Sequence, residues 1–193
     1  MKQQIKAVLS FVFNWPLWLA LKLRADVMHD IYAKSWYDDV AHFPHLNFFE
    51  LLAERPFYRI LLFYRLRSWG TILRTIYPSY SHFRFNSWKE MSLGGGVYLD
   101  HPYCSVLNAK SIGMDLHIKH FVTIGNSHNG IPIIGDHVTI GCGAVIVGDI
   151  VVGDYVKIGA NSVVVKNVPS NCTVVGNPAF IVKRDGKLVN EKL

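Results

Sequence analysis

Cysteine is scarce in this chain of 193 residues, and the three cysteines are Cys104, Cys142 and Cys172. An odd number of thiols forms no fully paired disulfide framework, which excludes the class of small secreted domains held together by disulfides. A recognisable secretory cleavage site is also lacking. We therefore expect a reducing, cytoplasmic environment.

The sequence also lacks a long hydrophobic run. Its most apolar stretch, residues 7–21, has fifteen residues and contains Asn14 and Pro16, so it is short for a membrane-spanning helix. Trp and Phe inside the stretch, with Lys and Arg around it, are typical of helices that lie in a membrane interface. A core helix packed on its neighbours or on another subunit gives the same pattern. Both interpretations stay open, and the first predicts peripheral contact with the anionic inner face of the membrane.

Acidic residues are fewer than basic ones, 14 against 20, which gives a formal charge of +6. Most of the excess lies in residues 1–92, which carry twelve basic and seven acidic side chains, against eight and seven in residues 93–193. A basic half-chain suggests an anionic partner such as a phosphate-bearing ligand or a lipid surface. No nucleic-acid-binding module is recognisable, so nucleic acid is not expected as a partner.

What the sequence does contain is a repeat. A branched aliphatic residue recurs about every six positions, at Leu93, Leu99, Val106, Ile112, Ile118, Ile124, Ile134, Ile140, Ile146, Val152, Ile158 and Val164. A fixed period of six is typical of a parallel β-helix, whereas an ordinary β-sandwich gives no reason for it. Three short strands close one coil of eighteen residues, so the twelve repeats predict about four coils around a continuous aliphatic core.

The six-residue register breaks twice. The step from Leu99 to Val106 is seven residues, and the step from Ile124 to Ile134 is ten, so four residues within 125–133 leave the coil as a loop. Insertions in a solenoid often project on the binding face. Both breaks contain histidine, His101 in the first and His128 in the second.

These patterns divide the chain into three parts. Residues 1–82 form an α-helical N-terminal region, because apolar residues recur there at three- and four-residue spacings and Pro56 suits a first helical turn. Residues 83–178 form the β-helix, and 179–193 a polar C-terminal tail after a Gly- and Pro-containing cap. The predicted fold is mainly β.

Three C-terminal motifs resemble the hexapeptide-repeat acyltransferases, and within them the serine acetyltransferase-like group. They are Ile140-Gly-Cys-Gly-Ala-Val-Ile-Val-Gly-Asp-Ile, Ile158-Gly-Ala-Asn-Ser-Val-Val and Val175-Gly-Asn-Pro-Ala. Leu99-Asp-His-Pro and Val122-Thr-Ile-Gly are similar to the active-site coils of that group. The resemblance implies a left-handed β-helix, a homotrimer with active sites between adjacent subunits, and acetyl-CoA as donor. The handedness rests on the resemblance alone, since parallel crossovers are normally right-handed.

The expected reaction is direct transfer of an acetyl group to a hydroxyl. An alcohol attacks a thioester only when a base takes its proton, and histidine suits this role near neutral pH. The catalytic histidine of the family falls on His101. A backbone amide near Gly125 would stabilise the oxyanion. The position of the family's acidic partner is held by Asn86, for which Glu90 or Asp100 can substitute.

The acceptor is expected beside His120, Thr123, Gly125 and His128, and His128 on the loop is also a fallback base. Serine acetyltransferases carry an Arg-His pair before the proline that re-enters the coil, and here Gly130 and Ile131 precede Pro132. Without that pair the carboxylate of serine has no obvious binding partner. The short loop is similar to relatives that acetylate sugars. We therefore expect a sugar hydroxyl in cell-surface polysaccharide biosynthesis, with serine O-acetylation in cysteine biosynthesis as the alternative.

For the donor, the resemblance predicts a groove lined by small turn residues, Cys142, Gly143, Ala160 and Asn161. Lys166 matches a basic position near the 3′-phosphate of CoA, and Lys183 or Arg184 can assist.

Three other hypotheses compete. His101, His117 and His120 evoke the zinc site of β-helical carbonic anhydrases, but their separations of sixteen and three do not fit that pattern, so no metal is expected. Cys104 beside His101 suggests a thiol relay, against which a small packing residue is the simpler interpretation. A non-catalytic β-helical scaffold is the third, and the intact Leu99-Asp-His-Pro motif argues against it.

Overall fold

The computed structural model describes residues 30, 56–66, 70, 84–85 and 91–193. The chain divides into two compact units, Met1–Ser81 and His82–Leu193, which are described separately. The predictions for residues 7–21, Asn86 and Glu90 lie outside the described residues. Within the described part of the chain, no helix combines the length and the apolar character that crossing a membrane requires.

The first unit contains helix α4 (Pro56–Leu66), which begins at a proline whose missing N–H is no loss in a first turn. Apolar side chains such as Leu61 and Leu62 are buried. Arg65, in the last turn, donates from Nε to Asp30 Oδ2 at 2.6 Å and from Nη2 to Asp30 Oδ1 at 2.9 Å. Both side chains are only 3% exposed, so this is a buried two-point ion pair.

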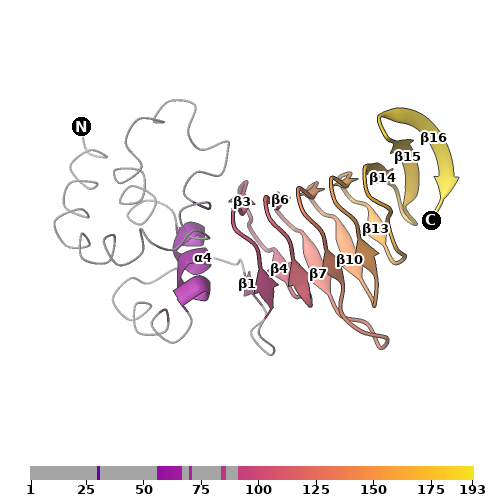
Figure 1. Ribbon diagram of the computed structural model, residues 1–193. Helices are drawn as coiled ribbons and strands as arrows, with labels where there is room; N and C mark the ends of the chain where they lie inside the picture. Colours follow the sequence, from indigo (N-terminus) through magenta and orange to yellow (C-terminus); the bar gives the residue numbers. More distant parts are fainter. Residues whose placement is uncertain (1–29, 31–55, 67–69, 71–83, 86–90) are drawn as a thin grey trace, which may run out of the picture. The chain divides into compact units, whose positions relative to one another are not determined.

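The second unit is a parallel β-solenoid of three sheets (Figure 1). Sheet A consists of β1 (Arg84–Phe85), β4 (Val106–Leu107), β7 (Thr123–Gly125), β10 (Val145–Val147) and β13 (Val163–Val164). Sheet B consists of β2 (Ser92–Leu93), β5 (Ser111–Ile112), β8 (Ile133–Ile134) and β11 (Val151–Val152). Sheet C begins with β3 (Tyr98–Leu99), β6 (His117–Ile118), β9 (Thr139–Ile140) and β12 (Lys157–Ile158).

Successive strands visit sheets B, C and A in rotation, which makes about four coils. Each coil lies in register on the one before, as in the row Leu99, Ile118, Ile140 and Ile158 of sheet C. These inward aliphatic residues are at most 3% exposed and form the core. The predicted mainly β fold, with a β-helix of about four coils preceded by a helix, is confirmed.

The first register break is larger than the sequence predicted. The inward residue of β4 is Leu107, with no exposed surface, while Val106 is half-buried and faces outward. The step from Leu99 is therefore eight residues, and the following step to Ile112 is five. The prediction of Val106 as the inward residue was wrong because two adjacent aliphatic residues both satisfy the pattern.

The last residues extend sheet C. Strand β14 (Cys172–Val175) pairs in parallel with β12, and then β15 (Phe180–Arg184) and β16 (Lys187–Lys192) follow as antiparallel strands. Residues 179–193, interpreted from their polarity as a tail, thus form a hairpin on the last coil. This hairpin pairs with backbone groups that a strand edge would otherwise expose.

Candidate active site

One edge of the solenoid, where each coil passes from sheet C to sheet A, carries the described catalytic candidates and four of the predicted donor residues, namely Asp100, His101, Cys142, Gly143, Ala160 and Asn161. We call this the C–A edge and define it as residues 100–105, 119–122, 141–144 and 159–162. Backbone hydrogen bonds join its turns from coil to coil, from Phe121 N to Tyr103 O at 2.8 Å, from Gly143 N to His120 O at 3.0 Å and from Asn161 N to Cys142 O at 2.8 Å.

The register of sheet C aligns the residues that follow each strand. His120, Cys142 and Ala160 form one row along the edge, which Tyr103 continues into the first coil, so His101 lies in the longer turn just before that row. Small residues are required in the neighbouring row, because a Cβ on Gly141 would lie 2.6 Å from the backbone nitrogen of Ala160. The predicted base and the predicted donor-binding turns therefore lie along a single edge, with the turn at His120 between them.

His101 projects from the longest turn of this edge. Its backbone has a φ of 51°, a left-handed conformation that histidine adopts more readily than most residues. Its side chain is 70% exposed, so it can reach a ligand beside the coil. Ser105 holds the turn: its hydroxyl is fully buried, donates to Lys119 O at 3.2 Å and accepts from Val122 N at 3.0 Å.

Asp100 lies between three basic side chains. Lys119 Nζ donates to Asp100 Oδ2 at 2.7 Å. His117 Nε2 is 3.7 Å from the same oxygen, and His101 Nε2 is 3.7 Å from Oδ1. Both imidazole distances are too long for a hydrogen bond. Three residues were candidates for a partner of His101. Asn86 and Glu90 lie outside the described residues, and the carboxylate of Asp100 lies beside the His101 ring.

The charges of this cluster are set by its contacts. The hydrogen bond from Lys119 lowers the pKa of Asp100, and the same bond raises the pKa of Lys119. Burial lowers the pKa of His117, which outweighs the opposite influence of Asp100. Asp100 and Lys119 are thus both charged at neutral pH, while His117 is neutral.

The residues predicted around the acceptor are distributed over two edges. His120 lies on the C–A edge against Phe121, and Thr123 and Gly125 face outward from β7 in sheet A. His128 is exposed in the loop between β7 and β8, on the A–B side of the coil. Within one chain, His128 and His101 therefore stand at different edges.

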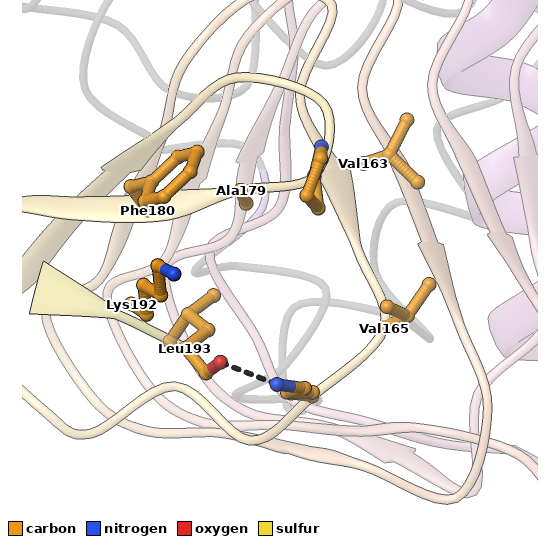
Figure 2. A pocket seen from close by; sticks show the side chains of 8 residues that line it. Val163, Val165, Ala179, Phe180, Lys192 and Leu193 are labelled. Carbon is orange, nitrogen blue, oxygen red and sulfur yellow. Dashed lines mark hydrogen bonds between the residues drawn. The ribbon is translucent and has the colours of Figure 1, made fainter.

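Lys166 follows β13 and lines a cavity of about 250 Å³ near the last coil. The cavity walls are mainly apolar, including Val163, Ala179 and Phe180, and Lys192 also lines it (Figure 2). Lys166 Nζ donates to the Leu193 carbonyl at 2.6 Å. An apolar wall with a lysine at its rim fits an elongated ligand that carries a phosphate.

The other two predicted donor residues lie elsewhere. Lys183 lines a separate cavity on sheet C, together with Tyr155 and Lys157. Arg184 is paired with Glu191 of the same hairpin. Neither lines the cavity beside Lys166.

Sequence reasoning missed the contact between Asp100 and Lys119 and considered His117 only as a metal ligand. Nineteen positions separate Asp100 from Lys119, one more than in a regular coil of eighteen residues. The step from Leu99 to Leu107 is two residues longer than a regular repeat, and the step from Leu107 to Ile112 is one residue shorter. The register of β3 on β6 would have revealed the pair. Among the described residues, no group of His, Cys, Asp and Glu has a metal-binding arrangement.

We next compared the chain with protein families, curated proteins and solved structures. Residues 131–166 match the family described as bacterial transferase hexapeptide (six repeats). The serine acetyltransferase of Buchnera aphidicola subsp. Schizaphis graminum is 46% identical over 99 residues, which is 48% of this chain and 38% of that protein. The chain thus spans well under half the length of that curated relative.

Solved structures agree over more of the chain. Soybean serine acetyltransferase complexed with serine matches with a TM-score of 0.66 and 28% identity, over 83% of this chain and 69% of that one. Serine acetyltransferase of Brucella abortus strain S19 in complex with coenzyme A matches with a TM-score of 0.66 and 27% identity, over 93% and 72%. The resemblance to the serine acetyltransferase-like group is confirmed.

These comparisons overturn one prediction. The sugar hydroxyl of a surface polysaccharide was expected as acceptor, and this was wrong, because the similar proteins are serine acetyltransferases. The prediction gave decisive weight to two positions of one loop, Gly130 and Ile131. A cation that binds a carboxylate need not come from that loop.

Proposed function

We propose that this protein is an acetyl-CoA-dependent serine O-acetyltransferase with His101 as general base. The observation that carries the proposal is the C–A edge, which holds both His101 and the predicted donor turns at Cys142 and Ala160. Strand β13 follows the last of these turns and leads to Lys166 and its cavity. The named relatives support serine as acceptor and CoA as the donor carrier.

In this mechanism the imidazole of His101 takes the proton of the serine hydroxyl, and the oxygen forms a bond to the thioester carbonyl carbon. The tetrahedral intermediate collapses as the carbon–sulfur bond breaks. The imidazolium then returns its proton to the departing sulfur, which leaves CoA as a thiol and serine as its O-acetyl ester. A backbone amide near Gly125 stabilises the oxyanion.

Asp100 supports the base by charge. Its Oδ1 lies 3.7 Å from His101 Nε2, and a nearby carboxylate stabilises the imidazolium that forms when the serine proton is taken. Lys166, with the apolar walls of its cavity, binds the distal part of the donor. The active site lies between subunits of a homotrimer, so His128 reaches the acceptor from a neighbouring chain.

Removal of the base tests the proposal. We expect His101→Ala to lower kcat for O-acetylserine formation by about 10² to 10⁴, because a positioned proton acceptor contributes about that factor. Thiol release and mass spectrometry of the product measure the reaction. His137→Ala is the matched control, because His137 is a partly exposed histidine at the edge between sheets B and C, where it faces Asp115.

Two results would contradict the proposal. Wild-type protein that forms no O-acetylserine from acetyl-CoA and serine would exclude the assigned reaction. A His101→Ala variant with the activity of the His137→Ala control would exclude the assigned base.

A further inference from the structure

We infer that Lys119 is a specificity-determining residue that binds the carboxylate of the acceptor amino acid. The inference rests on the proposed function and assigns to the corner of the coil a role that the 126–131 loop lacks the charge to fill.

Position is the first argument. Lys119 follows β6 as Asp100 follows β3, and the register of these strands places the two residues side by side on consecutive coils. His101 follows Asp100 in the chain, and its Nε2 lies 3.7 Å from Asp100 Oδ1. A ligand whose hydroxyl lies at His101 therefore has its other polar groups within reach of Asp100 and Lys119.

Charge is the second argument. Lys119 is the one Lys or Arg residue of the C–A edge as defined above, so among these described residues it is the one permanent cation on the edge that holds His101. Loop residues 125–132 carry no Lys or Arg either. Lys119 remains 44% exposed although it is bound to Asp100, whereas Asp100 is 21% exposed. The ammonium thus lies on the solvent side of the pair, where an incoming anion meets it first.

Complementarity is the third argument. A free amino acid is a zwitterion with an ammonium and a carboxylate on one carbon. The Asp100–Lys119 pair presents the opposite charges 2.7 Å apart, so an amino acid can bind with each charge facing its counterpart. A neutral alcohol or a sugar gains nothing from this arrangement. The pair therefore selects for the charged backbone of an amino acid.

A simpler role would be that Lys119 only holds Asp100 in place. Steady-state kinetics with two acceptors distinguish the roles, because serinamide keeps the hydroxyl and the ammonium of serine but lacks its carboxylate. We expect Lys119→Met to raise KM for serine about 10- to 100-fold, the effect of losing one charged hydrogen bond, with KM for acetyl-CoA changed less than about two-fold.

The decisive quantity is the preference for serine over serinamide in kcat/KM. Wild type should prefer serine about 10- to 100-fold, Lys119→Met should bring the ratio close to one, and Lys119→Arg should restore most of it. Lys157→Met is the control, since it removes the same charge from an exposed position on sheet C. It should leave the ratio as in wild type.

The outcomes separate this inference from the proposed function. If wild type acetylates serine but Lys119→Met loses activity on serine and serinamide equally, or keeps the wild-type preference, the carboxylate role of Lys119 is overturned and the proposed reaction stands. If wild type acetylates neither, the proposed function itself fails.

Discussion

The carboxylate of Asp100 lies beside three basic side chains at the site. Asp100 directs Oδ2 to Lys119 and His117 and Oδ1 to His101. A carboxylate already bound to a lysine is a weaker base, so it stabilises the imidazolium of His101 without competing for its proton. This division of the two oxygens explains how Asp100 can assist His101 while remaining ionised.

The ionisation of His117 gives a prediction at the same scale. Burial lowers its pKa, so the folded protein binds this proton less readily than the unfolded chain does. The contribution to stability is thus present above about pH 6.5 and is lost as the pH falls through the window below that value. Among the described residues, Tyr98, Asp100 and Lys119 are the titratable groups that face it.

Histidine NMR measures this directly. The His117 ring signals should titrate with a midpoint below the ordinary value of 6.5, and a His117→Asn variant should show a weaker fall in stability with acid. A midpoint above 6.5 would mean that attraction to Asp100 dominates over burial.

At the scale of the element, the turn at His101 decides the register of the first coils. Its two additional residues displace Val106 outward and place Leu107 in the core. The longer turn lets the His101 side chain project into solvent, whereas a side chain in a regular turn packs against the turns of the neighbouring coils.

Core substitutions test this register. Leu107→Ala should lower the free energy of unfolding by about 2–5 kcal/mol, because it leaves a cavity in a fully buried position. Val106→Ala should cost about 1 kcal/mol, since the side chain is only half-buried. Denaturant unfolding of both variants measures the difference, and equal losses would contradict the assigned register.

The sequence predicted the elements that depend on periodicity and left open those that depend on pairing. The row Ile118, Ile140 and Ile158 follows from the six-residue pattern alone. The break at His101 was visible, but its length was not, because Val106 and Leu107 are interchangeable to a pattern of apolar residues. The Asp100–Lys119 contact does not depend on that length, because Leu99 and Ile118 are three repeat steps apart with either residue inward. The periodicity therefore already put the two side chains at the same corner of consecutive coils, although we did not draw this consequence from the sequence. The polar residues of β16 carried no strand signal strong enough to separate a hairpin from a tail.

At the scale of the whole molecule, the separation of His101 and His128 bears on assembly. The two histidines stand at different edges of one chain, so both contribute to a single site only if two chains meet. The proposed homotrimer of 21.9 kDa chains provides such a meeting.

Mixed oligomers test this arrangement. His101→Ala and His128→Ala should each be strongly impaired as pure proteins. Co-expressed in equal amounts, they should recover about a quarter of wild-type activity, because about that share of shared sites combines two unaltered histidines. Sedimentation analysis confirms that the mixture assembles. A mixture no more active than its components would show that the two residues do not act together across a boundary between chains.

The stacked turns of the C–A edge also fix the distance between its first and last turns. Adjacent coils are about 4.8 Å apart, so the three coil-to-coil steps from the turn that holds His101 to the turn that holds Ala160 cover about 14 Å. A molecule that reacts at the first turn and is anchored beyond the last must be long and narrow, and the number of intervening coils dictates its reach. For the proposed acetyl transfer, this spacing favours a thioester long enough to span these turns.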